Sequence, residues 1–210
     1  FWPLAGTVNQ ANIGADGRLG DHYPQIMKPV IGAINGWAAG AGFYIMLTSM
    51  DIRIACEEHA RFKFALLSQG WVGSGPGATY LPRQIAHADA MRILLTDEPF
   101  DAKEALRINL INEVVPHDNL MSRAEELATQ ITKVPPIAVR MMKEFVLKFK
   151  DVPVTEAWRV QTLINALLTQ FTTDCDEGRA ALLEKRRPVC SVEKRHKGLL
   201  VSGLCGTQGD

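Results

Sequence analysis

Residues 28–42 read K-P-V-I-G-A-I-N-G-W-A-A-G-A-G, and this stretch decides how the chain folds. Val30–Ile34 is a short apolar run of the kind that forms a buried strand. The pair Asn35-Gly36 then signals a turn. Gly40 and Gly42 lie directly before a second apolar segment, Phe43–Leu47, where a helix is expected to begin. This order predicts a strand, a glycine turn and a helix N-terminus whose first backbone N–H groups point outward.

The junction has two interpretations. Outward N–H groups at the positive end of a helix can stabilise a negative oxygen, such as that of a thioester enolate, and so form an oxyanion hole. Alternatively, the glycines only relieve crowding in a tight turn. The local pattern leaves both interpretations open, because a short glycine motif has low specificity.

The composition narrows the class of protein. The chain has 210 residues, and 23 basic residues balance 23 acidic ones, so no bulk charge favours nucleic acid or a membrane surface as partner. Cys56, Cys175, Cys190 and Cys205 are widely scattered, which is typical of reduced thiols and not of a disulfide framework or a zinc site. No apolar run reaches the length of a membrane span, and no signal peptide opens the chain. We therefore predict a soluble intracellular protein without a metal. Because Phe1 and not Met comes first, a fragment or processed product is expected.

Up to residue 116 the pattern alternates between strand-like and helical segments. These segments are Ile52–Ala55, Ala60–Phe64, a glycine loop at Gly70–Gly77, Ala88–Thr96, a capping box of Asp101 with Glu104, and Ile111–Val115. From residue 117 only helical patterns follow, over Leu120–Ile131, Ile137–Phe149, Val154–Phe171 and Asp176–Arg187. The sequence predicts an α/β protein with a core over residues 1–116, a helical region over 117–188 and a flexible tail over 189–210.

Four stretches, in order and at matching spacing, resemble one known family. They are the opening stretch at 28–42 with D-I-R-I-A at 51–55 and A-R-F-K-F at 60–64; G-W-V-G-S-G-P-G-A-T-Y-L-P-R at 70–83; L-L-T-D-E-P-F-D-A-K-E-A-L-R-I-N-L-I-N-E-V-V-P at 94–116; and D-E-G-R-A-A-L-L-E-K-R-R-P at 176–188. On these stretches the chain is identified as a member of the crotonase (enoyl-CoA hydratase/isomerase) family. The match runs from about Ile26 to Pro188.

The resemblance implies a fold and a ligand. It implies a ββα spiral core with a C-terminal helical trimerisation region, and hence a homotrimer or a dimer of trimers. The family's first strands are expected to be missing here. The resemblance also implies an acyl-CoA thioester as substrate, with CoA as part of that substrate and no separate cofactor.

The resemblance also implies an oxyanion hole made by two backbone N–H groups. One donor falls on Ala41, between Gly40 and Gly42; an alanine N–H can serve as well as a glycine N–H where the dihedral angles suit an L-residue. The family's second donor lies in an A-G-x-D-like loop upstream. Leu4-Ala5-Gly6 is a faint candidate, closer to Lys28 than the family spacing implies.

Hydratases of this family use two glutamates, and neither is present here. The first position falls on Tyr44, or on Ile45 if the register shifts by the one extra residue before Asp51. The second falls on Leu66, in a segment without carboxylates. Paired carboxylates activate water and handle the α-proton, so two-glutamate hydration is not expected. Tyr44 is the leading catalytic candidate, and the alternative is a core-edge tyrosine with a satisfied hydroxyl.

Several further side chains are candidates for catalysis or substrate binding. Ser68, Gln69, Ser74 and Tyr80 lie near the glycine loop, although the serines also suit turns, and His59 and His87 suit the surface. By resemblance, Lys185 would contact CoA phosphates, with Arg186 and Arg187 extending a basic helix end; the alternative is a solvated helix end. Trp71 either lines the acyl pocket or packs under the loop.

Three functions remain open at this stage. The first is an acyl-CoA-processing enzyme of hydratase/isomerase type with altered acid and base groups. The second is a catalytically weak acyl-CoA-binding or assembly subunit, which the replacement of three further family glycines by Ala86, Asp97 and Asn109 favours. The third takes G-S-G-P-G-A at 73–78 as a dinucleotide fingerprint, although no Rossmann strand precedes it.

Overall fold

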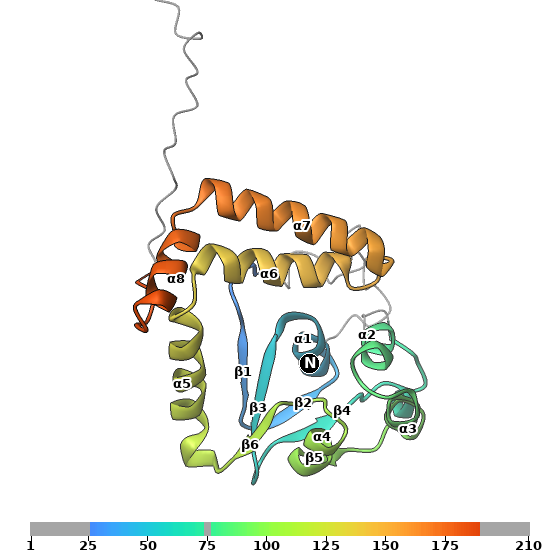
Figure 1. Cartoon of the computed structure of the whole chain (residues 1–210). Coiled ribbons are helices and arrows are strands. Elements are labelled where there is room, and N and C mark those ends of the chain that lie inside the picture. Colours follow the sequence, from blue (N-terminus) through green and yellow to red (C-terminus); the bar gives the residue numbers. More distant parts are fainter. Residues whose placement is uncertain (1–25, 74–76, 190–210) are drawn as a thin grey trace, which may run out of the picture. The chain divides into compact units, whose positions relative to one another are not determined.

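The structure is a computed structural model that describes residues 26–73 and 77–189. The chain divides into two compact units, Phe1–Thr129 and Gln130–Asp210, and each is described by itself (Figure 1). Predictions for residues 1–25, 74–76 and 190–210, including the upstream oxyanion donor and most of the predicted tail, fall outside the described residues.

The described part of the first unit contains two small sheets. One sheet has the order β1 (Ile31–Ile34), β3 (Ile52–Cys56), β6 (Glu113–Val115), and its strands are all parallel. The other has the order β2 (Trp37–Ala39), β4 (Arg61–Lys63), β5 (Phe100–Asp101), with β2 parallel and β5 antiparallel to β4. In Figure 1, helix α1 (Ala41–Ser49) lies in the angle between β1 and β2.

The chain passes alternately from one sheet to the other. It runs from β1 through the turn at residues 35–36 into β2, continues through α1, and returns in β3 beside β1, with Ile31 opposite Ile52. It then enters β4 beside β2, with Trp37 opposite Arg61. This repeat of two strands and a helix confirms the predicted α/β spiral. The strand β2 was not expected, because W-A-A has no alternating pattern and stands between turn residues.

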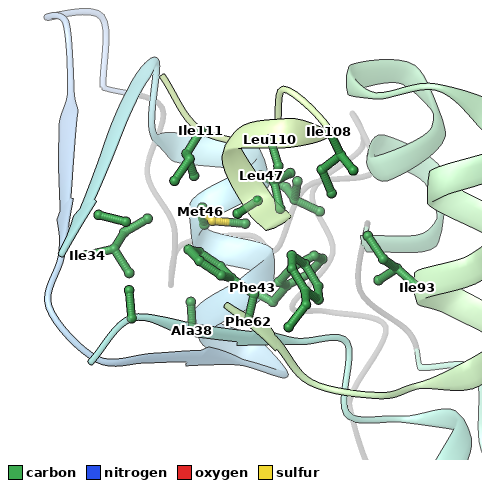
Figure 2. Close-up of a cluster of buried hydrophobic side chains, with 14 of the residues drawn as sticks. Ile34, Ala38, Phe43, Met46, Leu47, Phe62, Ile93, Ile108, Leu110 and Ile111 are labelled. Atoms are coloured by element: carbon green, nitrogen blue, oxygen red, sulfur yellow. The ribbon is translucent and has the colours of Figure 1, made fainter. Parts of the chain in front are cut away.

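Helix α1 is apolar on every side and sits in the core. Phe43 and Met46 have no exposed surface, and Leu47 is almost fully buried. Figure 2 shows these three side chains among Ile34, Ala38, Phe62, Ile108, Leu110 and Ile111. The ring of Phe43 meets Phe64 and Phe100 edge-on, at centroid distances of 6.4 and 6.5 Å. A helix this rich in apolar residues is stable only when much of its surface is buried, and α1 packs against β2 and α2.

A buried arginine fixes the C-terminal end of α1. The guanidinium of Arg53 donates to the carbonyls of Leu47 (3.4 Å) and Leu110 (3.0 Å) and to the side chain of Gln84 (2.8 Å). Gln84 in turn donates to the Leu47 carbonyl (2.8 Å). Burial lowers the pKa of Arg53 to about 10, against a smaller opposite effect of Asp51. These bonds satisfy a helix-end carbonyl that would otherwise lack a partner.

Short helices complete the first unit. They are η3 (Leu67–Gln69), α2 (Gly77–Gln84), α3 (His87–Thr96), α4 (Ala102–Arg107), η4 (His117–Asn119) and α5 (Leu120–Thr132), whose last residues belong to the second unit. The predicted cap of α4 is confirmed, because the Asp101 carboxylate accepts the N–H of Glu104 at 2.9 Å. Helix α2 was not predicted, since it begins at a glycine and contains Pro82.

Two of the three residues that stand at family glycine positions adopt a left-handed backbone conformation. Asp97 has φ 50° and Asn109 has φ 59°, each just after a helix, which is where glycine is common. Asp and Asn tolerate this conformation better than most side chains do. Ala86 has an ordinary extended conformation (φ −59°, ψ 139°), so an alanine is unstrained there.

The second unit contains α6 (Pro136–Phe149), α7 (Val154–Phe171) and α8 (Asp174–Leu183). The prediction that the last helix extends to Arg187 was wrong. Lys185 adopts left-handed backbone (φ 53°), its N–H donates to the Leu182 carbonyl (3.3 Å), and the N–H of Arg186 donates to the Ala181 carbonyl (3.0 Å). This is the Schellman pattern that ends a helix.

None of the described helices is long and apolar enough to cross a membrane. The boundary predicted at residue 116 differs from the division after Thr129 and stays a prediction.

Candidate active site

The turn before α1 places Ala41, the predicted oxyanion donor, at the first position of the helix. Gly40 adopts φ 52° and ψ −115°, a conformation that side chains disfavour. Its N–H donates to the Lys63 carbonyl (3.3 Å), and its own carbonyl accepts from the Tyr44 N–H (3.1 Å). The helix therefore begins at Ala41, which is exposed. The N–H groups of a first helical turn have no acceptor within the helix, and the role of the Ala41 N–H as donor to an external anion stays a prediction.

Tyr44 and Leu66 converge on one glycine. A β-carbon placed on Gly73 would lie 2.3 Å from Leu66 Cδ1 and 2.6 Å from the Tyr44 hydroxyl. A β-carbon on Gly77 would lie 2.1 Å from the Tyr44 ring. Both glycines are therefore required by these close approaches, and the two side chains at the expected glutamate positions contact the same segment. Ile45 is only half-buried, so the contacts favour Tyr44 over the shifted register.

The Tyr44 phenol is neutral and buried. Only 7% of the residue is exposed, and its ring lies 5.9 Å from that of Phe64. Burial, and to a lesser degree the charge of Asp97, raise the pKa of Tyr44 to about 12. Within the described residues, its hydroxyl has no hydrogen-bond partner. The expectation of a satisfied core-edge hydroxyl is thus not met in this part of the chain, and near neutral pH the phenol can donate a proton but cannot act as a base.

The loop that carries Leu66 is held by Asp97, a contact the sequence did not reveal. The Asp97 carboxylate accepts the N–H groups of Ala65 (2.5 Å) and Ser68 (2.8 Å) and the Ser68 hydroxyl (2.6 Å). Burial alone would raise the pKa of Asp97, but these hydrogen bonds and the charge of Lys63 outweigh it and lower the pKa. Asp97 is therefore ionised and fully engaged.

Comparisons with known proteins identify the family. Residues 15–191 match the family model described as enoyl-CoA hydratase/isomerase. The chain belongs to the enoyl-CoA hydratase/isomerase family. It is 34% identical over 190 residues to a carnitinyl-CoA dehydratase from Citrobacter koseri, covering 88% of this chain and 71% of that protein. It also resembles the crystal structure of an enoyl-CoA hydratase from Bacillus anthracis, with a TM-score of 0.76 at 32% identity over 80% of this chain and 64% of that one.

A third comparison points the same way. An enoyl-CoA hydratase/isomerase structure from Mycobacterium paratuberculosis has a TM-score of 0.74 and 34% identity, over 84% of this chain and 68% of that one. Family membership confirms the resemblance drawn from the sequence, the crotonase fold and a hydratase/isomerase-like enzyme. The interpretation of residues 73–78 as a dinucleotide-binding fingerprint is not supported, because Gly73 follows η3 and not a strand.

Of the other candidate side chains, some form hydrogen bonds within the loop and others lie at the surface. The Ser68 hydroxyl is held by Asp97, and the Gln69 amide donates to the Ala65 carbonyl (2.6 Å). Tyr80 is half-buried and Ser74 lies outside the described residues. His87 is exposed at the start of α3, and the exposed His59 ring meets that of His117 edge-on at 5.1 Å. The described residues contain no group of three or more ligands that could hold a metal.

The basic segment after α8 contains one cation, Arg186, that is paired with carboxylates, and two exposed cations, Lys185 and Arg187, without an ion pair to a described residue. Arg186 pairs with both carboxylate oxygens of Glu177 and with Glu184 (2.5 Å), and its hydrogen bonds lower the pKa of Glu177 to about 2. Lys185 is exposed and forms no ion pair with any described residue. It lies beyond the helix and not in it, so the expected basic helix end was wrong in its geometry.

Trp71 lies at the surface, directly after the Leu66 loop. It is 36% exposed, and its backbone N–H donates to the Leu66 carbonyl at 3.4 Å. This exposure does not fit a side chain packed under the loop, whereas a ligand could cover it.

Proposed function

We propose that the protein is an acyl-CoA enzyme that holds a thioester oxygen on the Ala41 N–H and works without the two hydratase glutamates. The observation that carries this proposal is the convergence of Tyr44 and Leu66 on Gly73. These are the expected glutamate positions, and they hold a neutral phenol and an aliphatic side chain. Gly40 and Gly42 flank the donor and leave room for the thioester.

In this proposal each residue has a limited role. The Ala41 N–H stabilises negative charge on the thioester oxygen as an enolate develops. The Tyr44 phenol donates a hydrogen bond or a proton to the substrate next to that oxygen. Leu66 keeps water from being activated at the second position, and Trp71 lines the acyl pocket. Lys185 binds a CoA phosphate, since it is exposed and, like Arg187, is not paired with Glu177 or Glu184.

A chromophoric thioester, 4-dimethylaminocinnamoyl-CoA, tests the oxyanion donor. Its absorption moves to the red when its carbonyl is polarised, so we expect a red shift on binding to the wild-type protein. Ala41→Pro removes the N–H, and proline is tolerated at a first helical position. This variant should lose most of the shift. His87→Pro, at the first position of α3, is the matched control and should keep it.

A crotonyl-CoA hydration assay tests the replaced glutamates. We expect no hydration above the background rate, and clear hydration would overturn the roles given to Tyr44 and Leu66. Absence of binding by the chromophoric thioester would overturn the acyl-CoA proposal itself.

The second candidate function is a catalytically weak acyl-CoA-binding subunit. It is favoured by the absence of a carboxylate at both Tyr44 and Leu66. Tyr44→Phe separates the two candidates, because it removes the only proposed proton donor. Loss of turnover in this variant would support the enzyme, and unchanged turnover would exclude Tyr44 from the chemistry. Binding of thioesters by the wild-type protein without any turnover would support the binding subunit.

We also propose assembly into a homotrimer or a dimer of trimers through the helical region. Large apolar side chains of α7 are exposed in the single chain: Val154, Trp158, Leu163, Leu167 and Phe171. Several large apolar side chains exposed on one helix are typical of an interface. Light scattering coupled to size exclusion should give three or six chains per particle; a monomer at micromolar concentration would overturn this part.

A further inference from the structure

The segment that follows β4 carries two features of the candidate site. The Lys63 carbonyl accepts the N–H of Gly40, which precedes the proposed donor Ala41. Leu66, three residues after Lys63, lies close to Gly73, as does the hydroxyl of Tyr44. Between them, Ala65 adopts left-handed backbone (φ 63°), which is strained for a residue with a side chain. Something outside the loop must therefore hold Ala65 in this conformation.

Asp97 supplies that hold from another element. It follows α3, is 3% exposed, and accepts hydrogen bonds from Ala65 and from both the N–H and the hydroxyl of Ser68. Charge-assisted bonds of this kind are about twice as strong as neutral ones. The acceptor therefore fixes the loop on both sides of Leu66.

We propose that Asp97 is a positioning residue of the acyl-CoA site, which fixes the loop 65–68 so that Leu66 and Tyr44 meet at Gly73. This inference rests on the proposed function. It assigns a role to a residue that, judged by backbone conformation alone, would be a helix cap that glycine could replace.

The comparison with Asn109 separates positioning from capping. Asn109 also ends a helix in left-handed backbone (φ 59°), but it is exposed, and its side chain bonds to no described residue. Asp97 and Asn109 thus share the conformational role and differ in the side-chain contact.

The charge of Asp97 also acts on Tyr44. After burial, it is the second cause that raises the pKa of Tyr44, and the charged groups that act on Asp97 itself include Lys63. Asp97 therefore favours the neutral, proton-donating phenol.

The test compares Asp97→Gly with Asn109→Gly, which both relieve left-handed strain. Binding of butyryl-CoA is measured by titration calorimetry, and stability by urea denaturation. We expect Asp97→Gly to weaken binding at least tenfold and Asn109→Gly to change it less than twofold. Equal effects of the two variants would overturn the inference.

Asp97→Asn serves if Asp97→Gly does not fold, because it keeps the size of the side chain. It should weaken butyryl-CoA binding and lower the pH at which Tyr44 ionises, read as the absorbance difference at alkaline pH against Tyr44→Phe. A purely structural cap would not move that ionisation. In a double-mutant cycle, Ser68→Ala should add little to Asp97→Asn, since both remove the same contact.

The two proposals fail in different ways. If the wild-type protein does not bind butyryl-CoA, the proposed function is overturned, and Asp97 is judged by the Tyr44 ionisation and the coupling to Ser68. If the wild-type protein binds and Asp97→Asn binds equally well with unchanged Tyr44 ionisation, Asp97 is not a positioning residue.

Discussion

Helices α1 and α7 are both rich in apolar residues, yet they differ completely in burial. Phe43 and Met46 of α1 have no exposed surface, whereas Trp158 and Leu163 of α7 are 69% and 60% exposed. Helix α1 is therefore fixed by packing within its own unit. Helix α7 presents apolar side chains that the described helices of its own unit leave exposed, and the proposed assembly would cover them.

The largest expected effect breaks the packing of α1. Phe43→Ala removes a fully buried ring that contacts Phe64 and Phe100 and should cost about 3–5 kcal/mol of the free energy of unfolding. Trp158→Ala, the matched change on α7, should cost less than about 1 kcal/mol for the isolated chain, because little burial is lost. Urea denaturation measures both, and similar losses would contradict the contrast.

The second effect depends on pH and belongs to α1 alone, since α7 contains no tyrosine. The unfolded Tyr44 phenol ionises near pH 10, whereas the folded one keeps its proton up to about pH 12. Its contribution is present below pH 10 and is lost as pH rises towards 12, by up to roughly 3 kcal/mol. Tyr44→Phe should flatten this part of the stability curve; an unchanged slope between pH 10 and 12 would count against a buried neutral phenol.

The third effect concerns the exposed apolar surface of α7 and its role in association of the chains. Leu163→Ser should raise the concentration at which the chains dissociate about tenfold, which corresponds to about 1.4 kcal/mol. Gln161→Ser, at an exposed polar position of the same helix, is the control. Sedimentation equilibrium measures both, and identical dissociation would exclude this part of α7 from the interface.

The smallest effect concerns a surface ion pair of α7. Arg159 lies 2.8 Å from Glu156, and both side chains are more than half exposed. Glu156→Gln should change the free energy of unfolding by less than about 0.5 kcal/mol. A larger loss by thermal or urea unfolding would show that packing is not the main determinant of this helix.

Elements with a strong local pattern could be predicted from the sequence. The bounds of α7 match its apolar period and the preceding Pro153, and β1, β3 and β4 match their short apolar runs. The α/β class of the first unit could be predicted because these strand-like runs alternate with helical segments. The strand β2 could not be predicted, since three residues after a turn form a strand only when β4 lies beside them.

The candidate site could be predicted in part. The junction at Gly40–Gly42 and the positions of Tyr44 and Leu66 were read from local sequence and from family resemblance. The contact of Asp97 with Ser68 could not be, because it joins residues 29 apart in sequence and leaves no periodic signal. Asp97 stood out only as an unusual residue at a glycine position.

The hold of Asp97 on the loop 65–68 also sets an order of events during synthesis. Ala65 and Ser68 leave the ribosome well before their shared acceptor does, and the loop has only one short turn of helix of its own. Growing chains fold from the N-terminal end, so the strands around α1 can pair while this loop is still open. The loop around Leu66 is therefore fixed only once α3 and Asp97 have been made, and a chain stalled before residue 97 would contain the proposed thioester donor and the loop but not the carboxylate that holds the loop.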